Sequence, residues 1–182
     1  RELLSLTGLP YVVDAPEVDE SCALPPEEAV QEISRRKGLA GAAAHPGCVV
    51  LSADTLVAVD GKALGKPHSE EEAFQMLSLL SGTRHQVYTG LAVYQDDTRI
   101  VEHECTSVYF REISGKEIEG YLATGEPMDK AGSYGIQGRG CVLVEGIDGN
   151  YHNVVGLPTC LLAGMLRQVG IDVLTGGQEG RP

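Results

Sequence analysis

The chain has 182 residues, 42% of them hydrophobic, which is enough for one domain with a substantial core but not for two full domains. Its 14 basic and 26 acidic residues give a formal net charge of -12, which argues against nonspecific binding to nucleic acid, because that binding relies on clustered Lys and Arg. No apolar run approaches the ~20 residues that span a bilayer, and no signal-peptide pattern opens the chain, so we expect no membrane association.

The five cysteines indicate a reducing compartment. Their number is odd and no C-x-x-C pair occurs, which argues against a disulfide framework or a zinc knuckle. The pattern therefore predicts a cytoplasmic location. Cys48 and Cys160 have apolar neighbours, and we expect both to be small core residues.

Helix and strand signals alternate from the start of the chain. Residues 1–6 have the pattern of a helix interior that ends at Gly8, and we expect a strand and a loop to precede them in the full protein. Residues 11–13 predict a short strand, which is followed by an acidic loop. Pro25-Pro26 then opens a helix over 27–39, because proline is favoured in the first helical turn.

The middle of the chain predicts a buried strand and a helix. The apolar run 48–51 is typical of a strand covered on both faces, and it continues into a hairpin that turns at Asp60-Gly61. A Ser-x-x-Glu capping box at Ser69 predicts a helix that runs to Leu80.

The C-terminal half predicts further strands, helices and one glycine-rich loop. A second capping box at Ser114 opens a helix that ends near Gly125. The expected elements are strands at 86–95 and 99–110, a helix from 115, a glycine-rich loop at 132–140, a hairpin of 142–147 with 151–155, and a helix at 161–169.

This alternation predicts an α/β fold with a mixed β-sheet flanked by helices. We expect a single domain over 1–174. The Gly-rich tail, 175–182, is expected to be disordered.

Asp54 is the first candidate for chemistry, because it interrupts the most apolar strand of the chain. A carboxylate there would be partly desolvated, which is costly unless a metal or a cationic partner is close. One interpretation is that Asp54 only ends the strand and caps a turn. The functional interpretation is a general base or a metal ligand at the C-terminal edge of the strand, where α/β sheets tend to bind ligands.

Two lysines are candidates for binding an anion. Lys37 shares a helix face with Val30 and Ile33, so it either lies at the rim of the core or reaches into a cleft. Lys66 precedes a proline, which favours an extended backbone and a defined direction for the side chain, although a plain turn has the same pattern. Arg36 and its neighbour Arg35 are interpreted as solvated charge.

Two further segments carry polar groups suited to a ligand. Glu17, Asp19 and Glu20 cluster carboxylates of the kind that bind magnesium, although exposed acidic loops are common. Asp129 and Lys130 precede the glycine-rich loop, in which backbone N–H groups can approach a ligand. Gln137 lies in that loop, with amide atoms that can hydrogen-bond a base edge, although a merely flexible loop has the same composition.

Together these segments resemble the Maf family of nucleotide pyrophosphatases, in the expected order and over nearly the whole chain. The stretch 125–138 is the most specific of them. The matching stretches are Ser-Ala-Asp-Thr-Leu-Val at 52–57, Leu-Gly-Lys-Pro at 64–67, Met-Leu at 76–77 with Leu-Ser-Gly at 80–82, His-Gln-Val-Tyr-Thr-Gly at 85–90, Gly-Glu-Pro-Met-Asp-Lys-Ala-Gly at 125–132, Tyr-Gly-Ile-Gln-Gly at 134–138, and Asn-Val-Val-Gly-Leu-Pro at 153–158.

The resemblance implies an elongated fold, related to inosine triphosphate pyrophosphatase, with a cleft between two lobes. It also implies hydrolysis of a nucleoside triphosphate to the monophosphate and pyrophosphate. Asp54 would be the proton acceptor and, with Glu20, a ligand of magnesium or manganese. Lys37 and Lys66 would neutralise phosphates, with Asp129 and Lys130 nearby in the substrate site.

Substrate preference and assembly are also implied by the resemblance. Thr55 and Gln137 match the subgroup that acts on dTTP, UTP and modified pyrimidine nucleotides. Family members have a strand and a Ser-rich loop ending in Pro-Arg-Arg before the position of Arg1. The resemblance also suggests a homodimer.

Two other functions share part of this pattern. An aspartyl phosphatase would need a second Asp two residues after Asp54, and Leu56 stands there. A nucleotide-binding regulator without turnover, linked to cell division and septum formation, would use many of the same residues as the enzyme.

Overall fold

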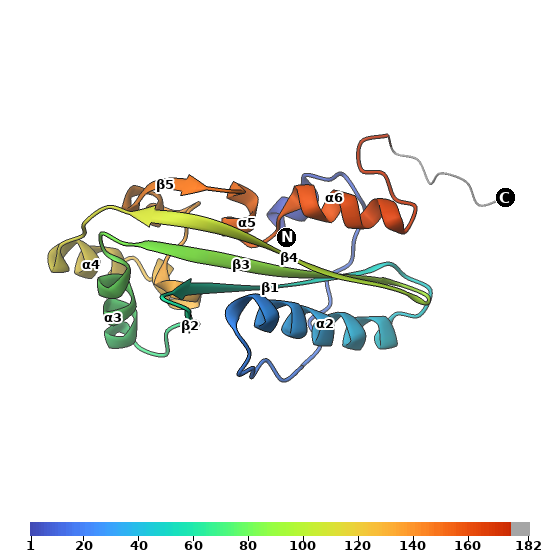
Figure 1. The fold of residues 1–182 in the computed structure, drawn as a ribbon, viewed down its shortest axis with the longest axis horizontal. Coiled ribbons are helices and arrows are strands. Elements are labelled where there is room, and N and C mark those ends of the chain that lie inside the picture. Colours follow the sequence, from blue (N-terminus) through green and yellow to red (C-terminus); the bar gives the residue numbers. More distant parts are fainter. Residues whose placement is uncertain (176–182) are drawn as a thin grey trace.

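The computed structural model describes residues 1–175, which form a long antiparallel sheet with helices on both faces (Figure 1). Within this part the strands follow the order β2-β1-β3-β4-β5, and each neighbouring pair is antiparallel. The α/β class is confirmed, with a sheet that is antiparallel rather than mixed. The strands are β1 (Val50–Val59), β2 (Lys62–Leu64), β3 (Arg84–Gln95), β4 (Thr98–Phe110) and β5 (Val144–Asp148).

Helices cover both faces and one end of this sheet. The helix α2 lies along one face, α1, α5 and α6 lie on the other, and α3 and α4 gather at one end (Figure 1). The α-helices are α1 (Glu2–Ser5), α2 (Pro26–Ala44), α3 (Glu70–Leu80), α4 (Gly115–Leu122), α5 (Tyr151–Val155) and α6 (Thr159–Gln168). Three 3-10 helices lie between α4 and β5: η1 (Glu126–Asp129), η2 (Ala131–Ser133) and η3 (Arg139–Leu143).

Buried apolar residues form two separate clusters, one towards each end of the sheet. The first joins α3 and α4 to the sheet through residues such as Leu77 and Ile118. The second packs Leu162 and Met165 of α6 against Leu91 of β3. Each cluster removes apolar side chains from water, which is the main force holding helices to a sheet.

The helix α2 packs unusually close to the sheet. A Cβ atom at Gly90 of β3 would overlap the carbonyl group of Val30, so the absence of a side chain there lets the two backbones meet. Gly38 lies against the ring of Tyr94, where an added Cβ would stand 2.8 Å from Cε2. This close contact fixes the height of α2 above β1, and therefore the position of Lys37.

Several local predictions are confirmed. Asp60 and Gly61 both have positive φ angles, as a two-residue hairpin turn requires, and they connect β1 to β2. Ser69 caps α3 by accepting a hydrogen bond from the backbone N–H of Glu72. Ser114 forms a complete capping box at α4.

Three local predictions are wrong. Residues 11–13 have no regular structure, and Val12 is 92% exposed. Residues 151–155 form the helix α5 rather than a strand, because the side chain of Asn150 accepts the N–H groups of its first turn. Cys48 and Cys160 are exposed rather than buried.

The tail expected to be disordered lies, from residue 176 onwards, outside the described residues. Among residues 1–175, no helix combines the length and the apolar character needed to cross a bilayer.

Candidate active site

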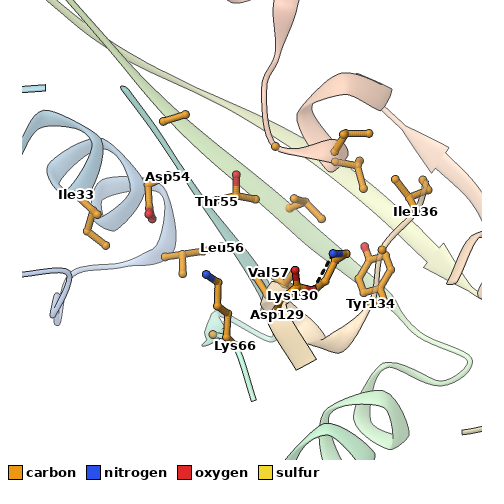
Figure 2. Close-up of a pocket in the computed structure, with 18 of the residues that line it drawn as sticks. Ile33, Asp54, Thr55, Leu56, Val57, Lys66, Asp129, Lys130, Tyr134 and Ile136 are labelled. Carbon is orange, nitrogen blue, oxygen red and sulfur yellow. Dashed lines mark hydrogen bonds and ion pairs between the residues drawn. The ribbon is translucent and has the colours of Figure 1, made fainter. Parts of the chain in front are cut away.

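One cavity of about 1020 Å³ lies between α2, β1 and the segment that runs from η1 to η3 (Figure 2). The eight residues to which the family resemblance assigns catalysis, substrate binding or metal binding all line it, whereas Glu17 and Asp19 of the acidic loop do not. The eight residues are Glu20, Lys37, Asp54, Thr55, Lys66, Asp129, Lys130 and Gln137. The structure therefore brings them together, while their individual roles remain predictions.

The cavity crosses an unpaired edge of β1. The strand β2 pairs only with Val57–Val59, so residues 50–56 of β1 have a neighbouring strand on one side only. Successive side chains of a strand point to opposite faces, and Asp54 and Thr55 do so here (Figure 2). Asp54 was expected at the end of its strand and instead lies in the middle of β1, where the free edge gives access to both faces.

Asp54 is held by a cation on α2. The ammonium Nζ of Lys37 lies 2.7 Å from Asp54 Oδ1 and 2.9 Å from Glu20 Oε1. The side chains of Asp54 and Lys37 are only 11% and 23% exposed. Burial raises the pKa of Asp54, and the hydrogen bond and charge of Lys37 offset this only in part. Asp54 is thus a carboxylate with increased proton affinity, facing a cavity.

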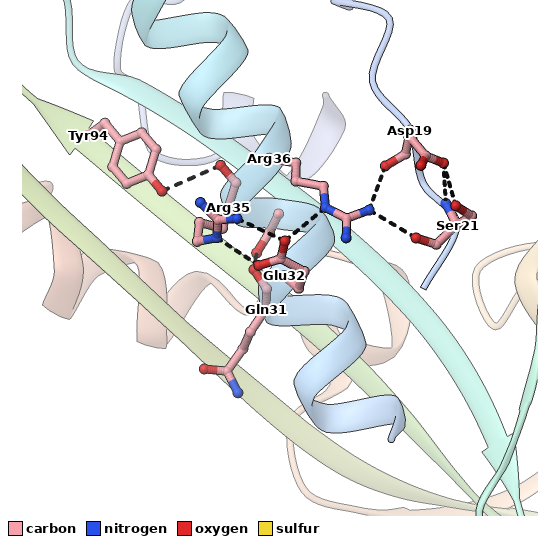
Figure 3. A network of polar contacts seen from close by, with 8 residues as sticks. Asp19, Ser21, Gln31, Glu32, Arg35, Arg36 and Tyr94 are labelled. Carbon is pink, nitrogen blue, oxygen red and sulfur yellow. Dashed lines mark hydrogen bonds and ion pairs between the residues drawn. The ribbon is translucent and has the colours of Figure 1, made fainter. Parts of the chain in front are cut away.

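Arg36 fixes the loop that carries Glu20. Its guanidinium donates to the carbonyl oxygens of Asp19 and Ser21, at 3.0 and 2.9 Å, and to Glu32 on its own helix at 2.8 Å (Figure 3). Arg36 was interpreted as solvated charge; its side chain is partly exposed, but it also makes these hydrogen bonds to the loop, which were not expected. Its partners are backbone groups in a loop without regular structure, so no sequence pattern indicates the contact.

Lys66 approaches Asp54 from the loop after β2. Its ammonium end points toward Leu56 and Asp54 (Figure 2), and its charge lowers the pKa of Asp54 slightly. The loop is tied to η2, because the carbonyl oxygen of Gly65 accepts the N–H of Gly132 at 3.0 Å. Lys66 therefore adds positive charge on the side of the carboxylate away from α2.

Glu126 organises the loop that carries Gln137. One of its carboxylate oxygens accepts the N–H of Arg139 at 2.8 Å, and the other accepts the N–H of Gly140 at 3.1 Å. The same second oxygen accepts the hydroxyl of Tyr121, which in turn accepts the N–H of Gly135. Burial raises the pKa of Glu126, but these hydrogen bonds outweigh burial and the pKa is lowered.

Both ends of the loop are thereby tied to a single carboxylate. Sequence analysis did not single out Glu126. The only signal was an acidic residue followed by proline before a glycine-rich stretch.

Asp129 and Lys130 form an ion pair at 2.8 Å at the mouth of this loop (Figure 2). Tyr134 lines the cavity behind them, and its hydroxyl lies 2.8 Å from Nε2 of His85, which is fully buried. Burial lowers the pKa of His85 to about 4, so the imidazole is neutral at pH 7. His85 therefore supports the cavity wall as an uncharged group.

The carboxylates of Glu20 and Asp54 converge on one point, where Lys37 lies. Within residues 1–175 no group of three or more His, Cys, Asp or Glu side chains is arranged to hold a metal. Magnesium is commonly bound through one or two carboxylates, with water and phosphate oxygens as its other ligands. Glu20 and Asp54 thus supply as many carboxylates as such an ion commonly uses, but the ammonium of Lys37 lies between them in this structure.

Comparison with known proteins finds one matching family and several similar relatives. A family model described as Maf-like protein matches residues 1–169. The dTTP/UTP pyrophosphatase of Symbiobacterium thermophilum is 50% identical over 179 residues, covering 97% of this chain and 92% of the relative. That of Moorella thermoacetica is 49% identical, covering 95% and 91%, and that of a Bacillus cereus strain is 44% identical, covering 95% and 92%.

Proposed function

The chain belongs to the Maf family, and we propose that it hydrolyses dTTP and UTP to the nucleoside monophosphate and pyrophosphate. Relatives that match it over most of both chains are named for this activity. The structural observation that carries the proposal is the buried carboxylate of Asp54, held by Lys37 beside Glu20 in a cavity at the upper end of the size range of small-molecule sites.

In this proposal Asp54 accepts a proton from a water molecule as the water oxygen attacks the α-phosphorus. The bond between that phosphorus and the bridging oxygen to the β-phosphate breaks, and pyrophosphate leaves. The raised pKa of Asp54 suits the task, because a general base works best when its pKa is near the working pH. Lys37 and Lys66 neutralise the phosphate oxygens from two sides.

Glu20 and Asp54 would also hold the divalent cation, magnesium or manganese. When bound, such an ion neutralises phosphate charge and makes the attacking water more acidic. Arg36 fixes the loop that carries Glu20. This loop places Glu20 Oε1 2.9 Å from Lys37 Nζ, beside Asp54.

The nucleoside would lie on the other face of β1. Thr55 faces that side, and Gln137 and Lys130 line the same cavity from the segment after η1. The strand edge between Asp54 and Thr55 would then lie beside the α-phosphate, where the two parts of the substrate join. We place this enzyme in the cytoplasm, acting on the nucleotide pool as a homodimer.

The regulator without turnover is not favoured, because each of the three relatives carries the name of an activity. Binding a polyphosphate requires the positive charge of lysines but does not require a buried carboxylate beside them. A site that only bound a metal-free polyphosphate would gain affinity by replacing Asp54 with a neutral residue.

A panel of standard and modified nucleoside triphosphates, assayed for pyrophosphate with magnesium and with excess chelator, tests the proposal. We expect pyrophosphate as the first product from dTTP and UTP, and none with chelator. In ¹⁸O-labelled water the label should enter the monophosphate, because attack is at the α-phosphorus. Orthophosphate as the first product, or label in pyrophosphate, would overturn the proposal.

A further inference from the structure

A chain of hydrogen bonds links the cavity to the backbone of α5. The hydroxyl of Thr55 lies 2.9 Å from that of Thr89, and Thr89 Oγ1 lies 3.1 Å from the carbonyl oxygen of Asn153. A carbonyl oxygen can only accept, so Thr89 donates its single hydroxyl hydrogen to Asn153. The bond between the two threonines must then be donated by Thr55, which uses its own hydrogen.

The hydroxyl of Thr55 therefore presents only lone pairs to the cavity, so it can accept a hydrogen bond from a ligand but cannot donate one. Thr55 lines the cavity, and Gly156 lies across from it, where an added Cβ would stand 3.4 Å from Thr55 Oγ1. Gly156 has a φ angle of +114°, a conformation that favours glycine, so this position stays without a side chain. The space in front of the oxygen is thus left open.

The fold, and not the solvent, fixes the direction of this chain. Thr89 and Asn153 are both fully buried. The side-chain amide of Asn153 donates to the carbonyl oxygen of Val87 at 3.0 Å and to Thr106 at 2.9 Å. Asn150 holds the backbone N–H of Asn153 at the start of α5. The carbonyl of Asn153 is therefore held toward Thr89.

We infer that Thr55 accepts a hydrogen bond from the N3–H imide of a uracil or thymine base, and that Thr89 is the positioning residue that makes Thr55 an acceptor. This rests on the proposed function. Uracil and thymine carry a hydrogen at N3, whereas cytosine presents a lone pair there. A cytosine base would place its lone pair against those of Thr55, which costs affinity.

The test is the Thr89→Val variant, which keeps the shape of the side chain and removes the acceptor. The hydrogen of Thr55 is then free to be donated to cytosine N3. We expect the ratio of kcat/KM for UTP to that for CTP to fall by about tenfold or more. Thr89→Ser should restore the ratio, and Thr98→Val, an exposed position at the β3–β4 turn, should leave it unchanged.

Two further measurements test the hydrogen bond from N3–H to Thr55 without the Thr89→Val variant. Wild-type enzyme should discriminate against 3-methyl-UTP, which lacks the N3 hydrogen, and Thr55→Val should lose that discrimination. If Thr89→Val does not fold, this pair of measurements decides the inference. Equal use of UTP and 3-methyl-UTP by wild type, or an unchanged UTP-to-CTP ratio in folded Thr89→Val, would overturn it.

Calorimetric binding of UMP and CMP separates this inference from the proposed function, because it needs no turnover. A protein that prefers UMP through Thr55 but releases no pyrophosphate would keep the inference and reject the enzyme. A protein that releases pyrophosphate but binds UMP and CMP equally would keep the enzyme and reject the inference.

Discussion

Lys37 Nζ lies 2.7 Å from Asp54 Oδ1, and this pair joins the helix α2 to the middle of β1. The contact depends on backbone packing as much as on charge, since α2 reaches this position only because Gly90 has no side chain. A carboxylate with raised pKa is thereby kept next to the cation that makes its burial tolerable. The pair links the stability of the fold to the chemistry of the site.

Asp54→Asn should remove the general base while keeping the shape of the site. We expect kcat to fall by roughly 10²- to 10⁴-fold, the usual contribution of such a group. Nucleotide affinity measured without divalent metal should stay the same or increase, because a negative charge beside the phosphates is lost. Steady-state kinetics and calorimetry measure the two effects. Asp60→Asn in the β1–β2 turn is the matched control, and an Asp54→Asn enzyme with unchanged kcat would contradict the role.

Lys37→Met should leave the Asp54 carboxylate buried without its cation. The pKa of Asp54, already raised by burial, should rise further because the offsetting charge is gone. Since protonation then removes the buried charge, the loss of stability relative to wild type should be largest at neutral pH and shrink as the pH falls and the carboxyl group is protonated.

Urea unfolding of the metal-free protein at several pH values measures this, with Lys62→Met on the exposed strand β2 as the control. A stability loss that is the same at every pH would show that Lys37 does not act on the charge of Asp54.

The sequence predicted the parts of this protein whose signals are local. The hairpin turn at Asp60-Gly61 and the cap at Ser114 depend on neighbouring residues, and both were found. Asp54 was recognisable because it interrupts an apolar run. The five residues 151–155 were misassigned, because β-branched and aromatic residues favour strands and the competing signal was a single capping residue, Asn150.

The assembly of the site could not be predicted from local patterns. Lys37 and Lys66 were each compatible with a plain surface position, and only the resemblance to a family placed them beside Asp54. Arg36 and Glu126 were missed because they bind backbone groups of irregular loops. Such contacts depend on tertiary structure and leave no periodic trace in the sequence.

Glu126→Ala should loosen the loop that carries Gln137 without touching Asp54. Two backbone N–H groups and the hydroxyl of Tyr121 would lose their acceptor. We expect KM for UTP to rise by roughly tenfold with little change in kcat, because hydrogen bonds to a charged group contribute about 1.5–3 kcal/mol each and part of this orders the loop.

Glu126→Gln keeps one acceptor oxygen and should recover part of the affinity. Glu119→Ala on the exposed side of α4 is the control. A fall in kcat at unchanged KM would contradict a role in loop positioning.

His85 should make the protein less stable in acid. Burial lowers the pKa of His85 from 6.5 to about 4, so the unfolded chain binds a proton at a higher pH than the folded one. This contribution to stability is complete above about pH 6.5 and is lost as the pH falls towards 4, up to about 3 kcal/mol.

Carboxylates also titrate in this range, so the informative quantity is the difference in unfolding free energy between wild type and His85→Gln. That difference should shrink as the pH falls. His103→Gln, at a partly buried position on β4, is the control for the loss of an imidazole elsewhere in the sheet. A constant difference for His85→Gln would mean that the buried imidazole does not resist protonation.

Gly90→Ala should separate α2 from the sheet. Its Cβ atom would overlap the carbonyl group of Val30, and backbone cannot move aside as a flexible side chain can. We expect a loss of about 3 kcal/mol or more in the free energy of unfolding, and lower activity in the folded fraction because α2 carries Lys37.

Gly120→Ala on α4 is the matched control. An added Cβ there meets nothing within 4 Å, and a helical alanine should stabilise by about 0.5–1 kcal/mol. Equal free energies for the two variants, measured by urea unfolding, would show that the contact between α2 and β3 does not position the site.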